Sequence, residues 1–317
     1  MPVEALRGWP PPVLDPAGPH ALAVTILAWA LLAMAVLVLA VVIVALLLGL
    51  FGPPTWKARL GLERLVWVGG LGFPVVVLTV LLIWGLGLTS RLTAPVTGEE
   101  LRIRVTGEMW WFRVAYLDGQ GREIVQSANE VVIPVGRPVV FELRSADVIH
   151  AFWVPRLAGK LDMIPGRTNL LRLQADEPGA YGGQCAEYCG GPHALMGFMV
   201  RAVPADEFDR WIGREPLPRP APTDALRAQG YGVFMENGCA ACHAIRGTPA
   251  VGLAGPDLST VGSRAMIGSG ILANNRGTLA GWIADSQAIK PGNRMPTYST
   301  LSGEDLQAVA AYLEGLR

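Results

Sequence analysis

Residues 184–196 read Gln184-Cys-Ala-Glu-Tyr-Cys-Gly-Gly-Pro-His-Ala-Leu-Met196. This stretch supplies two thiols, an imidazole and a thioether, from Cys185, Cys189, His193 and Met196. A His/Cys set with a weak Met ligand is typical of electron-transfer copper sites. A second imidazole, that of His150, lies upstream in Asp147-Val-Ile-His150 and must come from a different strand. The pattern therefore predicts a rigid β-scaffold that brings one loop and one strand together around copper.

Other uses of the same side chains stay open at this point. Two cysteines and two histidines suit a structural zinc ion, and Cys185 and Cys189 could form a disulfide. A single blue copper needs one cysteine and leaves the second unexplained. Two thiolates that bridge two metals, each metal with one histidine, use every ligand.

The region around this loop has the pattern of an all-β domain. Leu101-Arg-Ile-Arg-Val105 alternates with period two, and Asp118-Gly-Gln-Gly121 reads as a hairpin turn. Further strands are expected at 131–134, 138–143 and 168–173. Short strands separated by Gly and Pro over residues 91–213 predict a Greek-key sandwich.

Two segments near the N-terminus, residues 21–51 and 66–90, are apolar and lack Asp, Glu, Lys and Arg. A hydrocarbon core of ~30 Å needs about 20 apolar helical residues, so both segments predict transmembrane helices. Buried core helices are the alternative. A cleaved secretory signal is disfavoured, because the chain opens Met1-Pro-Val-Glu4 without a basic region.

The charges beside these segments predict their orientation. The connection at 52–65 holds Lys57, Arg59 and Arg64 against Glu63, whereas the segment 1–20 holds one basic residue, Arg7. By the positive-inside rule the connection is cytoplasmic. We therefore expect a two-pass protein of the bacterial inner membrane, in contact with lipid, with both termini on the periplasmic side. The formal net charge of zero gives no indication of a nucleic-acid partner.

The C-terminal part has a different character. Four prolines punctuate residues 214–222 and predict a stiff linker, namely Pro216, Pro218, Pro220 and Pro222. Beyond them, residues 223–317 predict a small all-α domain. Its last helix shows an i, i+3, i+4, i+7 apolar stripe made by Leu306, Val309, Ala310 and Leu313.

Asn237-Gly-Cys-Ala-Ala-Cys-His243 contains the C-x-x-C-H signature of c-type haem attachment. Cys239 and Cys242 would add to the haem vinyl groups, and His243 would be the proximal axial ligand. Met295 is the expected sixth ligand because it lies in a Pro-bounded loop, with Met266 as the rival. A redox-active C-x-x-C is the alternative interpretation.

Three stretches carry a resemblance to a known family. They are Asp147-Val-Ile-His150, Lys160-Leu-Asp-Met-Ile-Pro-Gly-Arg-Thr-Asn169 and Tyr181-Gly-Gly-Gln-Cys-Ala-Glu-Tyr-Cys-Gly190. They resemble subunit II of haem–copper cytochrome c oxidases, over residues 15–210. The resemblance implies a cupredoxin-like fold that holds a binuclear CuA centre.

The resemblance also implies a role for each ligand. Cys185 and Cys189 would bridge the two coppers, and His150 and His193 would each bind one. Met196 would complete one copper site and the backbone carbonyl of Glu187 the other. The Glu187 side chain would also reach a magnesium ion at the interface with the catalytic subunit.

The C-terminal domain is similar to class I cytochrome c. That family pairs the haem motif with K-P-x-x-x-M-P, present here as Lys290-Pro-Gly-Asn-Arg-Met-Pro296. Gly255-Pro-Asp-Leu258 belongs to the same resemblance and implies that Pro256 offers its carbonyl to His243. A copper domain followed by a cytochrome c resembles subunit II of caa-type oxidases.

Two further residues each have two interpretations. Trp110, in Met109-Trp-Trp-Phe112, matches the aromatic position at which electrons enter from cytochrome c in the family. Its alternative is ordinary strand core, where Trp110 and Trp111 would face opposite sides. Glu63 resembles the family's inner-end glutamate, but its wider spacing from Trp67 and Pro74 favours a solvated loop residue.

These resemblances imply an electron-transfer subunit of a terminal oxidase. Electrons would pass from an external cytochrome or quinol-oxidising complex to the haem, to CuA and to a catalytic subunit I that reduces oxygen with proton translocation. The chain has 4 histidines, three of them already assigned, so the oxygen site must lie in a partner. A nitric oxide reductase subunit and a copper-delivery or redox-sensing protein are the alternatives.

Overall fold

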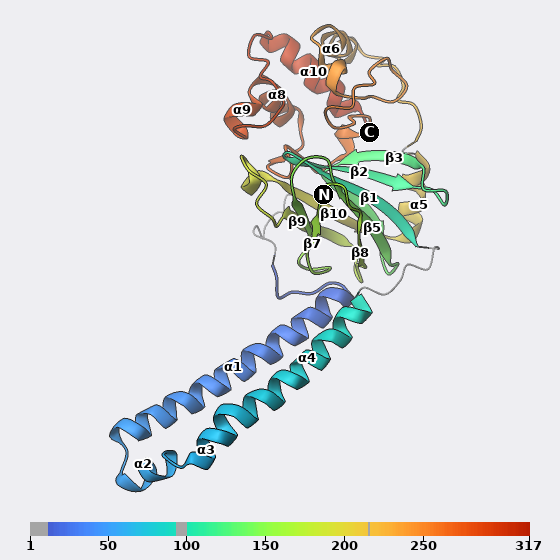
Figure 1. Cartoon of the computed structure of the whole chain (residues 1–317). Coiled ribbons are helices and arrows are strands. Elements are labelled where there is room, and N and C mark those ends of the chain that lie inside the picture. Colours follow the sequence, from blue (N-terminus) through green and yellow to red (C-terminus); the bar gives the residue numbers. More distant parts are fainter. Residues whose placement is uncertain (1–11, 93–99, 215) are drawn as a thin grey trace. The chain divides into compact units, whose positions relative to one another are not determined.

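The computed structural model describes residues 12–92, 100–214 and 216–317. Two compact units divide the chain, one from Leu22 to Pro95 and one that joins Met1–Ala21 to Val96–Arg317 (Figure 1). Most of the N-terminal segment expected at 1–20 lies outside the described residues, as do 93–99 and Glu215 of the expected linker.

The first unit is a helical hairpin. Its elements are α1 (Pro19–Phe51, whose first residues belong to the second unit), α2 (Pro54–Leu60), α3 (Glu63–Trp67), η2 (Val68–Gly72) and α4 (Phe73–Leu92). Pro19–Phe51 and the continuous run Glu63–Leu92 are both long and apolar enough to cross a membrane. Neither apolar stretch is buried inside the protein, so the alternative of buried core helices is wrong for the described chain.

The connection between the two spans is more ordered than the sequence suggested. α2 was not expected, and the second helical run begins at Glu63 rather than at residue 66. Glu63 is exposed and accepts a hydrogen bond from Trp67 Nε1 at 3.2 Å. The π-helical turn η2 ends at Gly72, two residues before Pro74, which has no N–H to continue the α-helical ladder.

The second unit begins with a two-sheet sandwich. One sheet has the order β3-β2-β1-β5-β8 and the other β4-β10-β9-β6-β7. The strands are β1 (Leu101–Glu108), β2 (Trp111–Leu117), β3 (Glu123–Ala128), β4 (Glu130–Pro134), β5 (Val139–Ser145), β6 (His150–Trp153), β7 (Leu161–Met163), β8 (Asn169–Leu173), β9 (Gly179–Cys185) and β10 (Gly197–Val203). The strands expected near 101–105, 131–134, 138–143 and 168–173 are confirmed.

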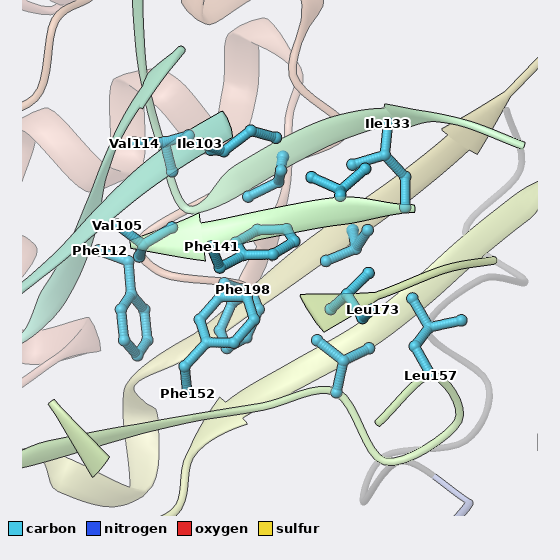
Figure 2. Packing of buried hydrophobic residues seen from close by; sticks show 14 of the residues in the cluster. Ile103, Val105, Phe112, Val114, Ile133, Phe141, Phe152, Leu157, Leu173 and Phe198 are labelled. Carbon is cyan, nitrogen blue, oxygen red and sulfur yellow. The ribbon is translucent and has the colours of Figure 1, made fainter. Parts of the chain in front are cut away.

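Alternating side chains from both sheets fill the space between them. Figure 2 shows aromatic rings at the centre of this core. The Phe152 ring stacks on Phe198 with centroids 4.5 Å apart, and Phe112 meets Phe198 edge-on at 4.8 Å. Such pairs add to the apolar area that the core buries. The stiff core fixes the strand ends from which the copper loop leaves.

A helix that the sequence did not indicate follows the sandwich. α5 (Ala205–Arg214) buries Phe208 against the sandwich core. The Trp211 ring contacts Tyr116 edge-on, with centroids 5.0 Å apart. α5 therefore belongs to the copper domain and ends where the Pro-rich linker was expected to begin.

The remaining residues of this unit form the helical C-terminal domain. Its elements are α6 (Ala225–Glu236), α7 (Cys239–Cys242), η4 (Val261–Ser263), β11 (Met266–Ile267), β12 (Leu272–Ala273), α8 (Arg276–Ala284), α9 (Ser286–Ile289) and α10 (Gly303–Gly315). The expected apolar stripe on α10 is confirmed, with Val309, Ala310 and Leu313 buried. The two-stranded ribbon β11–β12 is an addition to the all-α fold that the sequence predicted.

The crossing of α6 and α10 depends on Gly230. A Cβ atom built on Gly230 would lie 2.0 Å from the carbonyl oxygen of Ala308. The two backbones can therefore approach this closely only because residue 230 has no side chain. Gly232, two residues on in α6, has no atom closer than 3.9 Å to its built Cβ.

We expect Gly230→Ala to destabilise the C-terminal domain by about 1–3 kcal/mol, because overpacking forces the two helices apart. Gly232→Ala is the matched control and should be neutral or stabilising by up to about 1 kcal/mol, since alanine is the better helix former. Amide hydrogen exchange in α6 and α10 measures both. Equal protection in the two variants would contradict the tight crossing.

Candidate metal centre and haem cavity

The pairing of β6 with β9 determines the first half of the metal site. Phe152 lies opposite Cys185 in this antiparallel ladder. Residues two apart on a strand share a face, so His150 lies on the same side of β6 as Phe152. His150 Nδ1 is 3.9 Å from the Cys185 sulfur, and both residues are buried.

The loop from β9 to β10 supplies the other donors. A hydrogen bond from Cys185 N–H to the Met196 carbonyl, 2.9 Å long, closes the loop at its base. Cys189 Sγ then lies 3.4 Å from His193 Nδ1 and 3.8 Å from Met196 Sδ. The Glu187 carbonyl oxygen is 3.3 Å from Cys185 Sγ. All six residues predicted as copper ligands therefore converge on one place.

The two cysteines are free, and their sulfurs are 3.8 Å apart. A disulfide needs a sulfur–sulfur distance of about 2.05 Å, so the disulfide interpretation is wrong. Within the described residues, the ligand atoms of His150, Cys185 and Cys189 all lie within 4.8 Å of one another. The sulfurs form the centre of the donor cluster, with one imidazole beside each.

Asp147 orients the buried imidazole. Its Oδ1 is 2.8 Å from His150 Nε2, which leaves Nδ1 facing the sulfurs. Burial lowers the pKa of His150, but the contacts with Cys185 and Asp147 outweigh burial and raise it. A carboxylate on the far nitrogen of a ligand histidine is the usual way in which proteins fix its tautomer and ring orientation.

Ionisation of one of the two thiols opposes ionisation of the other. Their mutual hydrogen bond lowers the pKa of Cys185, and the same interaction raises the pKa of Cys189. Two buried thiolates this close repel each other unless a cation lies between them. The pair is therefore suited to metal binding, since a metal deprotonates its thiol ligands.

A second site lies in the C-terminal domain, where α7 carries the C-x-x-C motif. A cavity of about 410 Å³ is lined by Cys239, Cys242, His243, Met266 and Met295. His243 Nδ1 lies 2.8 Å from the Pro256 carbonyl, as the resemblance implied. Burial lowers the pKa of His243 and so favours the neutral form that binds metal. The cavity and its donors fit a covalently attached haem.

Both methionine candidates line this cavity, but their backbones are held differently. The Met295 N–H donates to Asn293 Oδ1 at 2.8 Å, and its carbonyl accepts from Ser286 Oγ at 3.0 Å and Gln287 Nε2 at 2.8 Å. Met266 lies in the short ribbon strand β11. The fixed Met295 loop is the better platform for an axial ligand.

Trp110 connects the two sites. It lies in the turn between β1 and β2 rather than in a strand, so the strand part of the alternative interpretation is wrong, but its side chain does pack against the sandwich core. Its indole N–H donates to the Cys189 carbonyl at 3.0 Å. The same residue also lines the haem cavity.

Two parts of the chain match known protein families. Residues 102–203 match the family described as cytochrome c oxidase subunit II, periplasmic domain, and residues 228–317 match cytochrome c. Cytochrome c oxidase subunit 2 of Alkalihalophilus pseudofirmus is 44% identical over 70% of this chain and 64% of that protein. The protein of the same name from Branchiostoma floridae is 33% identical over 44% of this chain and 67% of its own length.

The chain belongs to the cytochrome c oxidase subunit II family. It spans less than two thirds of the length of the Alkalihalophilus relative. The crystal structure of the periplasmic domain of the Bradyrhizobium japonicum subunit II is 34% identical over 36% of this chain and 92% of that one, with a TM-score of 0.34. Together the two matched families imply copper and haem c as cofactors.

Several residues around the metal ligands have contacts that the sequence patterns did not reveal. Asp147 belongs to a quoted motif, but only the fold brings its carboxylate to His150 Nε2. The backbone of Gly107 in β1 packs closely against the same imidazole, since a Cβ built on Gly107 would be 2.7 Å from His150 Cδ2. Lys160 Nζ lies 3.8 Å from Glu187 Oε2, so the proposed magnesium ligand has a lysine partner here.

We expect Gly107→Ala to lower copper affinity about 10–100-fold, the usual cost of disturbing a residue that orients a metal ligand. The added methyl group must displace the His150 ring. Gly179→Ala in β9 is the control, because its built Cβ has only ordinary contacts of 3.7 Å or more. Competition titration with a copper chelator measures both, and equal affinities would contradict the close packing of Gly107 on His150.

Proposed function

We propose that the chain is the electron-transfer subunit of a terminal haem–copper oxidase. The chain accepts electrons on haem c and passes them through a binuclear CuA centre to a catalytic subunit. That subunit reduces oxygen to water with proton translocation. The convergence of four further donors on a pair of sulfurs 3.8 Å apart supports this most strongly.

The donor set favours two coppers over one zinc. A structural zinc ion takes four ligands in a tetrahedron, whereas this site offers two thiols, two imidazoles, a thioether and a carbonyl. The two imidazoles contact different sulfurs, since His150 lies beside Cys185 and His193 beside Cys189. Each copper would therefore take one histidine, with Met196 on one side and the Glu187 carbonyl on the other.

The haem would be held by Cys239 and Cys242 through thioether bonds, and by His243 and Met295 on its iron. Met/His ligation raises the potential of cytochromes c. The Pro256 carbonyl fixes the tautomer of His243, and hydrogen bonds to the Met295 N–H and carbonyl hold the backbone of that loop in place.

The assembly around the chain follows from the same proposal. α1 and the run Glu63–Leu92 would span the bacterial inner membrane among lipids, with the Lys57 and Arg59 connection in the cytoplasm. Both metal domains would then face the periplasm. Catalytic subunit I and other oxidase subunits would dock here, with a magnesium ion beside Glu187, and an external cytochrome or quinol-oxidising complex would supply electrons.

Cys189→Ser should abolish the paired copper centre, because one thiolate cannot hold two coppers as a delocalised pair. Electron paramagnetic resonance and metal analysis measure the result. Cys242→Ser is the control, because it removes an exposed thiol from the haem cavity and leaves the copper ligands in place. Two equivalent coppers in Cys189→Ser would contradict the bridging role. Zinc in the unaltered protein, with no paramagnetic signal, would contradict copper itself.

Met295→Ala should leave the haem covalently bound but lower its reduction potential, since sulfur ligation favours the ferrous state. The sulfur-to-iron charge-transfer band should disappear. Met266→Ala is the matched control, because Met266 lines the same cavity. If only Met266→Ala removes that band, the ligand assignment is reversed.

Removal of residues 223–317 tests the function as a whole. The purified complex that lacks them should keep its copper signal and its partner subunits but consume oxygen more slowly with its native donor, because tethering raises the effective haem concentration to the millimolar range. Oxygen uptake and nitric oxide uptake are measured side by side. Nitric oxide consumption without oxygen uptake by the intact complex would overturn the oxidase assignment.

A further inference from the structure

The C-terminal domain places a buried polar cluster on the turn that holds Trp110. Lys290 is 3% exposed and Ser269 is 4% exposed, although both are polar. Lys290 Nζ donates to the Trp110 carbonyl at 2.6 Å and to Ser269 Oγ at 2.9 Å. Ser269 Oγ donates to the same carbonyl at 3.1 Å. One carbonyl of the copper domain is therefore capped by two side chains of the haem domain.

The Ser269 backbone makes a second connection. Its carbonyl accepts a hydrogen bond of 3.0 Å from the N–H of Gly197, the residue that follows the copper ligand Met196. Ser269 has a φ of +66°, a left-handed conformation, and lies between Gly268 and Gly270, which share it. A non-glycine residue rarely adopts this conformation, so its side chain is retained here at a conformational cost.

The burial of Lys290 separates it from ordinary surface lysines. Lysine is almost never fully buried unless it is paired, and the Nζ of Lys290 donates to a carbonyl and a hydroxyl, both of them uncharged. Desolvation lowers its pKa to about 7. Both the charged and the neutral amine carry N–H donors, so the contacts with Trp110 and Ser269 are available in either form.

We propose that Ser269 and Lys290 form a docking clasp, which grips the Trp110 carbonyl and the Gly197 N–H and keeps the haem cavity closed against the β1–β2 turn of the copper domain. Both residues line the haem cavity, but their side chains bond to the Trp110 carbonyl and to each other, so we assign them a positioning role. The clasp keeps Trp110 beside the haem cavity while its indole N–H is bonded to the Cys189 carbonyl. The consequence for electron transfer between the two sites rests on the proposed function.

The clasp makes docking depend on buried hydrogen bonds rather than on surface charge. Ion pairs between exposed groups weaken as salt is added, whereas buried contacts are screened much less. At the edge of the same contact, Arg294 lies 3.7 Å from Asp147, but its side chain is 63% exposed, so this ion pair adds little to docking that salt could remove. We therefore expect electron transfer from haem to copper within the intact chain to change little with ionic strength.

Two substitutions test the clasp in the full-length, metal-loaded protein. Lys290→Met keeps the length of the side chain but removes its donors, and Ser269→Gly removes the hydroxyl at a position whose φ suits glycine. Arg276→Gln is the control. It also removes a positive charge from the C-terminal domain, but from an ion pair with Glu314 that takes no part in the clasp. Lys290→Met leaves the Trp110 carbonyl with Ser269 Oγ as its donor, and the loss of the lysine hydrogen bond should lower the docking equilibrium constant about tenfold.

The first readout is hydrogen exchange at the Gly197 amide, followed by mass spectrometry with residue-level fragmentation. Exchange should quicken about tenfold in Lys290→Met and also rise in Ser269→Gly, and it should stay unchanged in Arg276→Gln. Unchanged protection of Gly197 in both Lys290→Met and Ser269→Gly would overturn the clasp, whatever the metals prove to be.

The second readout is the rate of electron transfer from photoreduced haem to copper. It should fall in Lys290→Met and Ser269→Gly while the haem and copper spectra stay as in the unaltered protein. A fall in Gly197 protection together with an unchanged transfer rate would overturn the positioning role. Loss of either metal spectrum in the unaltered protein would count against the proposed function and leave the exchange result to decide the clasp.

Discussion

The register of β6 on β9, in which Phe152 lies opposite Cys185, is the constraint on which the metal site depends. This pairing brings His150 to the sulfur that begins the ligand loop, and the Cys185 N–H bond to the Met196 carbonyl then closes that loop. A slip of one residue would turn every side chain of β6 to the other face. The stacking of Phe152 on Phe198 in the core opposes such a slip, because the Phe152 ring would have to leave the core. Rigid packing below the loop thus fixes the donors before any metal binds.

The β1–β2 turn extends this order to the second domain. Through one residue, Trp110, the turn contacts the copper loop by its indole and the haem domain by its carbonyl. Polar groups buried in such a contact make its geometry specific, since each unpaired group would carry a free-energy cost. The proposed electron path and the proposed clasp therefore use the same short turn. A subunit II with a fused cytochrome c gains from this arrangement, because a tethered donor with a fixed orientation needs no search for its acceptor.

Much of this could be predicted from local sequence. The period-two strands, the C-x-x-C-H motif and the apolar stripe on α10 are short-range patterns, and each ligand within residues 184–196 is close in sequence to the others. The position of Trp110 in a turn could not be predicted, because an aromatic pair gives no signal of whether a strand has already ended. The roles of Gly107 and Asp147 at His150 depend on contacts that only the folded sandwich creates. Lys290 was noticed as part of a haem-domain motif, yet its partner lies 180 positions away in sequence, beyond any local pattern.

The order in which the two sites are reduced tests the central claim most directly. The intact protein is mixed with a reduced donor in a stopped-flow instrument, and the haem absorption and the near-infrared copper band are followed together. A relay from the C-terminal domain through the Trp110 turn predicts that the haem is reduced first and that copper reduction follows at a rate independent of donor concentration. Copper that is reduced first, at a rate that rises with donor concentration and is the same in protein lacking residues 223–317, would show that electrons bypass the haem.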